Sequence, residues 1–435
     1  MLDFLSVFPQ CSLARAVLKR SASTPFAALR RLIAPAVDHA LREGCDDCRT
    51  VLGSLLDRGG SYADTGGEPW PHEPELETRA PKIAAKLVDM PASRRRMYLL
   101  QSGAACTRPV IEALLAEARS RLSTDSGKAV EIAEVAVFCA DNIRPGRYEE
   151  PVWSGIQAMA LTGLGGAHRR DGDLRAAGEA LEEAEAAAAL GDHHPLIAVG
   201  ILEKKGWLAI DRGFHEQALE LFSEAIEIAE ATADRHVRGR CLYNHAVSLR
   251  LMERYDEALD DLYVATMLLD VEREPRLGLI TLLELSSCSE GAGNLGSALA
   301  FLDHAERRWA RFMNVGDRIR LSWNRGRTHA MAGELSRARH YYALARQGFV
   351  ELDYPFDAAL VTLELAATLA EEGRFTEVGE LAGEILEVFR AVGVEKEAVT
   401  SIYLLRKAQS AAAVRQAAAA INRLKKTARS SRSAR

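Results

Sequence analysis

The stretch CLYNHAVSLRLMERYDEALDDLYVATMLL, residues 241–269, decides the fold of this chain. Its small and apolar residues recur at intervals of three, four and seven positions, the spacing at which one face of an α-helix repeats. The pattern breaks near Glu253 and then resumes, which predicts two helices joined by a tight turn. We therefore interpret the stretch as a helical hairpin.

The same hairpin pattern recurs along the chain. The predicted turns begin at Gly172, Gly213, Glu253, Gly293, Gly333 and Gly373. Successive turns are separated by 41 residues once and by 40 residues four times. Self-similarity at a fixed period of this length indicates stacked supersecondary units, each contacting its neighbours. Glycine at the turn also suits the left-handed conformation that ends many helices.

Small residues occupy fixed places in both helices of each hairpin. After the turn, an Ala ladder encloses one large residue, as in Ala258, Leu262 and Ala265. Seven positions before each turn stands another small residue: Gly165, Gly206, Ala246, Ser286, Gly326 and Ala366. Small side chains let paired helices cross closely, so the pattern predicts tight packing within each hairpin.

This combination of a small residue, a Gly-x-apolar turn and an Ala ladder resembles the tetratricopeptide repeat. The third unit shows it through Leu242, Ala246, Tyr255, Ala258, Leu262 and Ala265. The usual unit has about 34 residues, and the 40-residue period is similar to long-helix variants in bacterial regulatory and signalling proteins. HEAT repeats share the longer period but do not explain the turn and the ladder together. The resemblance implies an all-α fold, a right-handed α-α superhelix with a small helical N-terminal module.

The flanks of the repeats differ in composition, so we expect six segments. They are a small helical and zinc-finger-like module over 1–58, a Gly- and Pro-rich linker over 59–82, helices with a degenerate repeat over 83–157, six repeats over 158–394, capping helices over 395–426 and a basic disordered tail over 427–435. The tail is interpreted as a solubilising end. A contact with RNA or an acidic partner is the alternative for it.

Composition excludes several classes of protein. The net charge of −6 argues against a general DNA-binding protein. No apolar run is long enough to span a membrane, and the first residues do not read as a signal peptide. The seven cysteines are an odd number and lie mostly in apolar helical stretches, which is typical of a reducing compartment. We therefore expect a soluble cytoplasmic protein.

One motif near the N-terminus has the spacing of metal ligands. His39 is followed by Cys45 and Cys48, and two thiolates and an imidazole are three ligands for tetrahedral zinc. The segment resembles the zinc-finger domain of bacterial anti-sigma factors, although the spacing from His to Cys is longer here. Cys11 is the only cysteine further upstream. A metal-free hairpin with reduced cysteines is an alternative interpretation, and a redox disulfide between Cys45 and Cys48 is a third.

A second set of candidate residues lies on the first helices of the hairpins, which line the concave face in arrays of this type. The set is Arg240, Tyr243 and Asn244 in the third unit and Arg320, Trp323, Asn324 and Arg327 in the fifth. Asn side chains bond extended peptide backbones and Arg binds carboxylates, so the pattern predicts a groove for a peptide or an acidic C-terminus. In the alternative, these residues form ordinary ion pairs with Glu284 and Glu364.

The residues favour a protein- or peptide-binding scaffold, expected to act as a cytoplasmic bacterial regulatory or signalling adaptor. Sequestration of a partner such as a sigma factor is a concrete version, based on analogy of fold. The alternative function is a sensor whose superhelix changes shape on binding a peptide or small ligand. No catalytic motif is present, so we expect no enzymatic activity; zinc is the one cofactor the motifs indicate.

Overall fold

The computed structural model describes residues 11–391, apart from short gaps at 22–25, 44, 50, 53–72, 103–104, 123, 192–193 and 233. The expected capping helices over 395–426 and the tail over 427–435 lie outside these residues. The chain divides into two compact units, with the division inside helix α12. Every element in the described residues is a helix, and none is a strand.

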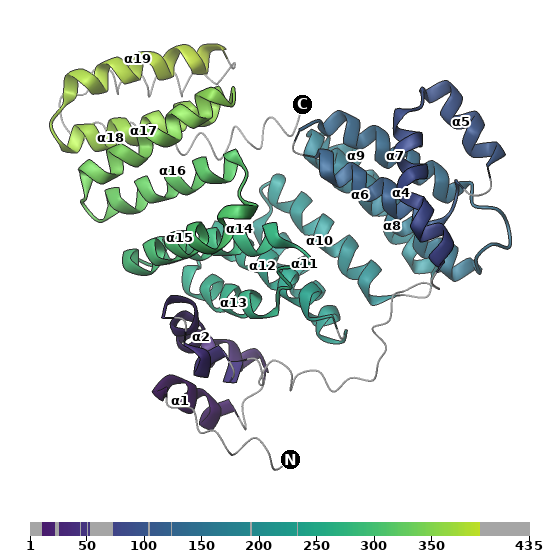
Figure 1. Cartoon of the computed structure of the whole chain (residues 1–435), viewed down its shortest axis with the longest axis horizontal. Coiled ribbons are helices and arrows are strands. Elements are labelled where there is room, and N and C mark those ends of the chain that lie inside the picture. Colours follow the sequence, from purple (N-terminus) through teal and green to yellow (C-terminus); the bar gives the residue numbers. More distant parts are fainter. Residues whose placement is uncertain are drawn as a thin grey trace. The chain divides into compact units, whose positions relative to one another are not determined.

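The α4–α12 unit takes its helices from residues 61–248. They are α4 (Pro74–Asp89), α5 (Ala92–Gln101), α6 (Arg108–Arg121), α7 (Ser126–Asp141), α8 (Glu150–Asp171), α9 (Leu174–Leu190), α10 (Pro195–Asp211), α11 (His215–Glu230) and most of α12 (Arg235–Leu251). Consecutive helices pack as antiparallel pairs, α6 on α7, α8 on α9 and α10 on α11 (Figure 1). Helices α6 and α7 lie where the degenerate repeat was expected.

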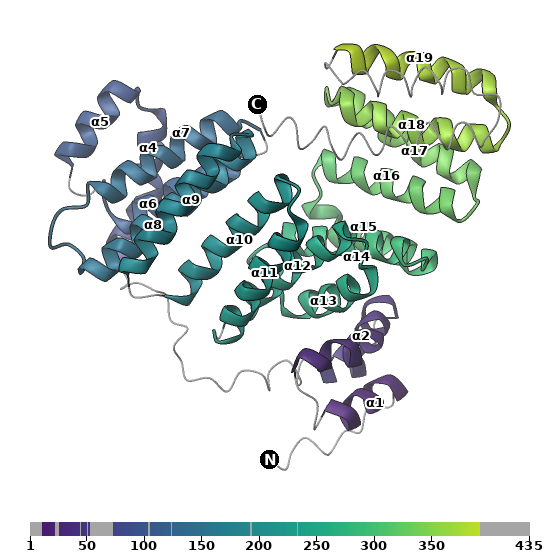
Figure 2. The same cartoon turned by 180° about the vertical axis from the view of Figure 1, so that it is seen from behind.

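The second unit, here called the module-bearing unit, combines the N-terminal helices with the later repeats. It contains α1 (Ser12–Ser21), α2 (Phe26–Arg42), α13 (Tyr255–Leu268), α14 (Pro275–Gly291), α15 (Leu295–Trp309), the 3-10 turn η1 (Ala310–Phe312), α16 (Val315–Met331), α17 (Leu335–Glu351), α18 (Pro355–Glu371) and α19 (Phe375–Ala391). Helix α2 packs against α13 and α15, more than 200 residues later in the chain (Figures 1 and 2).

The predicted turns have the expected backbone conformation. Gly172, Gly213, Gly293, Gly333 and Gly373 all have φ between 74° and 95°, the left-handed region. At the third turn Glu253 adopts φ 61° without being glycine. All six turns therefore share the left-handed backbone conformation. Glu253 is strained there, because it is not glycine.

Close crossing explains the small residues in the first helices. A Cβ placed on Gly206 would lie 2.5 Å from the ring of Phe222, and one on Gly326 would lie 2.7 Å from the ring of Tyr342. Phe222 and Tyr342 are the large residues of the following helices and are almost fully buried. At Gly206 and Gly326 the crossing therefore leaves no room for a side chain, which explains the glycine at these two positions.

The linker ends earlier than the composition predicted. Helix α4 begins at Pro74, although 59–82 was expected to lack regular structure. Pro74 is the first helical residue, where the missing N–H is not needed. The start is held by tertiary contacts: Tyr148 Oη and Arg147 donate to the Glu73 carboxylate, and Arg108 donates to Glu77. These partners lie 31 to 75 residues away, so local composition does not reveal them.

Candidate functional site

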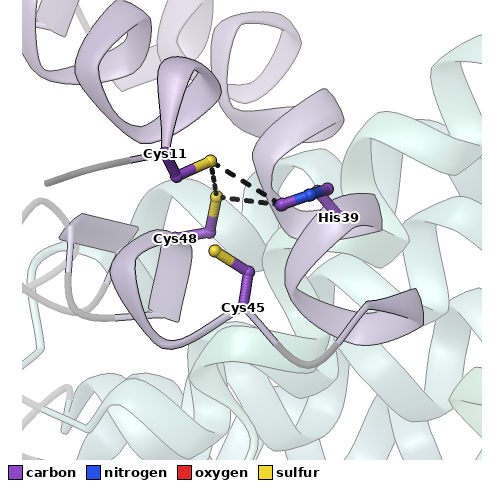
Figure 3. A group of neighbouring side chains, drawn as sticks. All are labelled: Cys11, His39, Cys45 and Cys48. Atoms are coloured by element: carbon purple, nitrogen blue, oxygen red, sulfur yellow. Dashed lines mark hydrogen bonds between the residues drawn. The ribbon is translucent and has the colours of Figure 1, made fainter.

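The N-terminal cysteines and histidine meet in one cluster of possible metal ligands. Cys11 directly precedes α1, and His39 lies near the end of α2. Cys45 directly precedes the short helical turn that follows, and Cys48 lies within that turn (Figure 3). One ligand atom from each of these residues lies within 4.8 Å of all the others. The main-chain N–H of Cys11 also donates to Asp47 Oδ2 over 2.8 Å, which ties α1 to the cysteine segment.

The separations between these atoms fit a tetrahedral metal centre. Cys11 Sγ lies 3.5 Å from Cys48 Sγ, and His39 Nδ1 lies 3.5 Å from Cys48 Sγ and 3.8 Å from Cys11 Sγ. Zinc bonds of about 2.3 Å to sulfur and about 2.0–2.1 Å to nitrogen place tetrahedral ligands about 3.6–3.8 Å apart. The cluster therefore could hold a metal ion with little rearrangement.

The surroundings of Cys11 and Cys48 shift the pKa values of the two thiols in opposite directions. The main-chain N–H of Ala14, at the start of α1, lowers the pKa of Cys11 by bonding to its sulfur. Burial instead raises the pKa of Cys48, which is 0% exposed, to about 12. A buried thiolate requires a neighbouring positive charge, and a bound cation supplies one by taking the thiolate as its ligand.

Three of the four cluster residues were predicted from spacing, and Cys11 was missed as a ligand. Its separation from Cys48 is 37 residues, with α1 and α2 between them, so no local spacing rule connects the two. All seven cysteines are free thiols in the structure, so the disulfide between Cys45 and Cys48 is not formed.

On the first helices of the α4–α12 unit, polar side chains form a network around Glu203. This carboxylate on α10 is 4% exposed and accepts from Arg240 Nε at 2.8 Å and from Asn244 Nδ2 at 2.9 Å. Asn244 Oδ1 accepts in turn from Trp207 Nε1 at 3.2 Å. Asn244, which is 4% exposed, is therefore bonded to both Glu203 and Trp207, and Arg240 is bonded to Glu203. Tyr243 is also largely buried.

Positive charge gathers beside this network. Burial lowers the pKa of Lys204, and the nearby Arg240, Arg169 and Arg119 act in the same direction. The guanidinium of Arg169 lies 5.6 Å from the centre of the Trp207 ring. Sequence analysis missed Glu203, Lys204 and Trp207, although their place on a first helix, one repeat before Arg240, was a usable signal.

The module-bearing unit has a comparable row on α16. Arg327 donates to Glu290 on α14, and Trp323 Nε1 donates to Glu364 on α18 over 2.8 Å. Asn324 accepts a longer bond from Arg327. Arg320 is exposed, with no ion pair or hydrogen bond among the described residues. Of the expected acids, Glu364 bonds to this row, whereas Glu284 pairs with Arg250.

A separate pocket of about 570 Å³ lies between α15, α16 and α17. Its lining is Leu299, Asp303, Arg325, His329, Ser336, Arg337, His340 and Tyr341. Arg325 is held by Asp303 at 2.6 Å and by Glu306 at 2.7 Å, while His329 bonds to Glu334 at 2.7 Å. These charges already serve internal ion pairs, so the pocket does not indicate a catalytic centre.

Comparison with known proteins supports the repeat class. Residues 201–266 match the family model of the tetratricopeptide repeat. The crystal structure of a Rap protein complexed with Competence and Sporulation Factor is similar, with 11% identity over 74% of this chain and 89% of that one and a TM-score of 0.54. The Rap conjugation gene regulator of plasmid pLS20 in complex with the Phr* peptide has 15% identity, coverage of 79% and 98% and a TM-score of 0.43.

A bacterial structure, BtubC (BKLC) from P. vanneervenii, shows 17% identity over 53% of this chain and 93% of that one, with a TM-score of 0.44. No curated protein sequence matches the chain. In the described residues, no helix is long and apolar enough to cross a membrane. The match over residues 201–266 confirms the predicted resemblance to the tetratricopeptide repeat, and the similarity to the Rap structure confirms the predicted all-α fold class.

Proposed function

We propose that this chain is a protein- or peptide-binding scaffold with a regulatory role, and that it binds through the first helices of its repeats. The observation that supports this most directly is the row on α16, where exposed Arg320 adjoins the half-buried Trp323 and Asn324. An unpaired guanidinium beside an indole is a combination enriched where proteins bind other proteins. The Rap protein named above is complexed with Competence and Sporulation Factor, which agrees with this choice.

A peptide-display screen on the full chain tests the scaffold. We expect Arg320→Ala to weaken the binding of the selected peptides about ten- to a hundredfold, since a charge-assisted contact contributes about 1.5–3 kcal/mol. Arg318→Ala is the matched control, because residues two apart on a helix point to different faces. Equal weakening by both variants, measured by fluorescence anisotropy, would remove Arg320 from the binding surface. A selected peptide that changes the small-angle scattering profile would favour the sensor over the scaffold.

We further propose that Cys11, His39, Cys45 and Cys48 bind one zinc ion as a structural site. Four protein ligands leave no open position for substrate, as in structural rather than catalytic zinc centres. Bound zinc would supply positive charge to the buried sulfur of Cys48 and cross-link α1, α2 and the cysteine segment.

Elemental analysis of the purified chain tests the zinc site. We expect about one zinc per chain in the wild type, and Cys11→Ser should lose zinc affinity as severely as Cys45→Ser. Cys288→Ala, a cysteine of the same unit far from the cluster in sequence, should retain full zinc content. Full zinc content in Cys11→Ser would show that the fourth ligand is not Cys11.

A further inference from the structure

The outer face of α13 differs from the same face of the other second helices. Val264 on this face is 0% exposed. The residues at the same place in the repeats are Glu183, Glu224, His304, Leu344 and Glu384, of which all but His304 are exposed. Tyr263, beside Val264, is likewise only 9% exposed. Some other part of the chain therefore covers α13.

Helix α2 is that cover. It packs against α13 and, at its side, against α15 (Figure 2). Its buried residues Ile33, Ala36, Val37 and Ala40 are 0–2% exposed and follow the i, i+3, i+4, i+7 spacing of one helix face. Helix α2, which carries this apolar stripe, thus packs on the second helix whose residue at this place in the repeat is fully buried.

The cysteine segment reaches the same surface. Burial lowers the pKa of His304 on α15, and the charges of Arg308, Arg307 and Arg49 act in the same direction. Arg49 directly follows the cluster residue Cys48. Arg49 therefore lies close enough to α15 for its charge to act on His304. The module thus contacts α13 and α15 through α2, and Arg49 of the cysteine segment lies near α15.

The four residues of the ligand cluster come from the segments of the N-terminal module, which contacts α13 and α15. They come from the start of α1, the last turn of α2 and the segment after it, so one ion would hold all three together. Helix α1 has 10 residues, and an isolated helix of this length is marginal in water without packing or cross-links. Small metal-bound modules commonly lose their structure when the metal is removed.

We propose that metal in the cluster latches the N-terminal module onto the outer face of α13, and that release of the metal undocks α2 and exposes this face. The proposal rests on the zinc site proposed above and adds regulation to it. In the latched state Tyr263 and Val264 are covered, and in the released state they form an apolar surface on the repeat array. The chain then presents a different surface to its partners according to metal occupancy.

Hydrogen exchange of the full chain, with zinc bound and after chelation, tests the latch. We expect amides of α2 and α13 to exchange about tenfold faster or more after zinc removal, since local opening follows the lost contacts. Helix α17, which has no module on it, should not change. Re-addition of zinc should restore protection. Unchanged exchange in α2 and α13, with zinc loss verified by elemental analysis, would overturn the latch and leave the zinc site standing.

A variant separates docking from metal binding. Val264→Glu places a charge under α2 and should raise exchange in α2 while the chain still holds its zinc. Leu344→Glu is the matched control at the same position of α17, where the side chain is 45% exposed, and should leave α2 protected. Equal protection of α2 in both variants would contradict docking on this face. A wild-type chain that binds no zinc would overturn both the zinc site and the latch.

Discussion

At the scale of single residues, the identity of the first turn residue changes the conformational free energy of the turn. Five of the turns use glycine at a left-handed φ, whereas Glu253 holds φ 61° with a side chain. An L-residue in this conformation costs about 1–2 kcal/mol, so the third turn is the strained member of the set. The repeat period predicted the turn, and only the backbone angles show the strain.

We expect Glu253→Gly to stabilise the chain by about 0.5–1 kcal/mol, because relief of the strain exceeds the added freedom of the unfolded chain. Chemical denaturation monitored by circular dichroism measures the change. The reciprocal variant Gly293→Glu, at the equivalent turn of the next repeat, should be destabilised. The prediction is wrong when Glu253→Gly lowers the denaturation midpoint.

Residue-scale prediction of the binding faces was less complete. Spacing on a helix placed Arg240 and Asn244 on one face, but it did not identify Glu203, which lies 37 and 41 residues earlier, as their acceptor. Cross-repeat contacts depend on how far one hairpin is rotated against the next. That rotation is a property of packing, so one helix's pattern does not contain it. The role of this face in binding stays a prediction.

At the scale of elements, a glycine within a helix can either allow a close helix crossing or only lower the stability of the helix. Gly206 and Gly200 both lie in α10, yet a Cβ on Gly206 would meet the Phe222 ring at 2.5 Å, whereas one on Gly200 would meet nothing within 4 Å. The first glycine is required by helix crossing. The second only lowers helix propensity.

The pair gives a test within one helix. Gly206→Ala should destabilise the chain, because overpacking against the fully buried Phe222 costs about 1–3 kcal/mol. Gly200→Ala should stabilise it by about 0.5–1 kcal/mol through helix propensity. Thermal unfolding of both variants beside the wild type measures these shifts. Similar shifts in both variants would show that α10 does not cross α11 as closely as described.

At the scale of the whole molecule, the contacts of the repeat array divide into two units. The division lies inside α12, and the N-terminal module belongs with the later repeats rather than with the helices that follow it in sequence. Repeats interact mainly with their neighbours, so a substitution that destabilises one unit should leave the other unit largely unaffected. The expected organisation had one continuous array with a separate module in front.

Leu114→Ala tests this division. Leu114 on α6 is 0% exposed, and its truncation should cost about 2–5 kcal/mol in the α4–α12 unit. Hydrogen exchange should accelerate in α6 to α9 while α16 to α19 keep their protection. Equal acceleration in both regions would indicate that the two units unfold together.

The sequence by itself determined the helices, their turns and their pairing into hairpins. These features depend on residues three to seven positions apart and on a period of 40, which local chemistry expresses directly. Only the tertiary structure brought Cys11 to His39 and Cys48, began α4 at Pro74 and set α2 on α13. Each of these depends on contacts between segments tens to hundreds of residues apart. Which apolar faces meet at such a distance is decided by the packing of the whole chain, and no spacing rule encodes it.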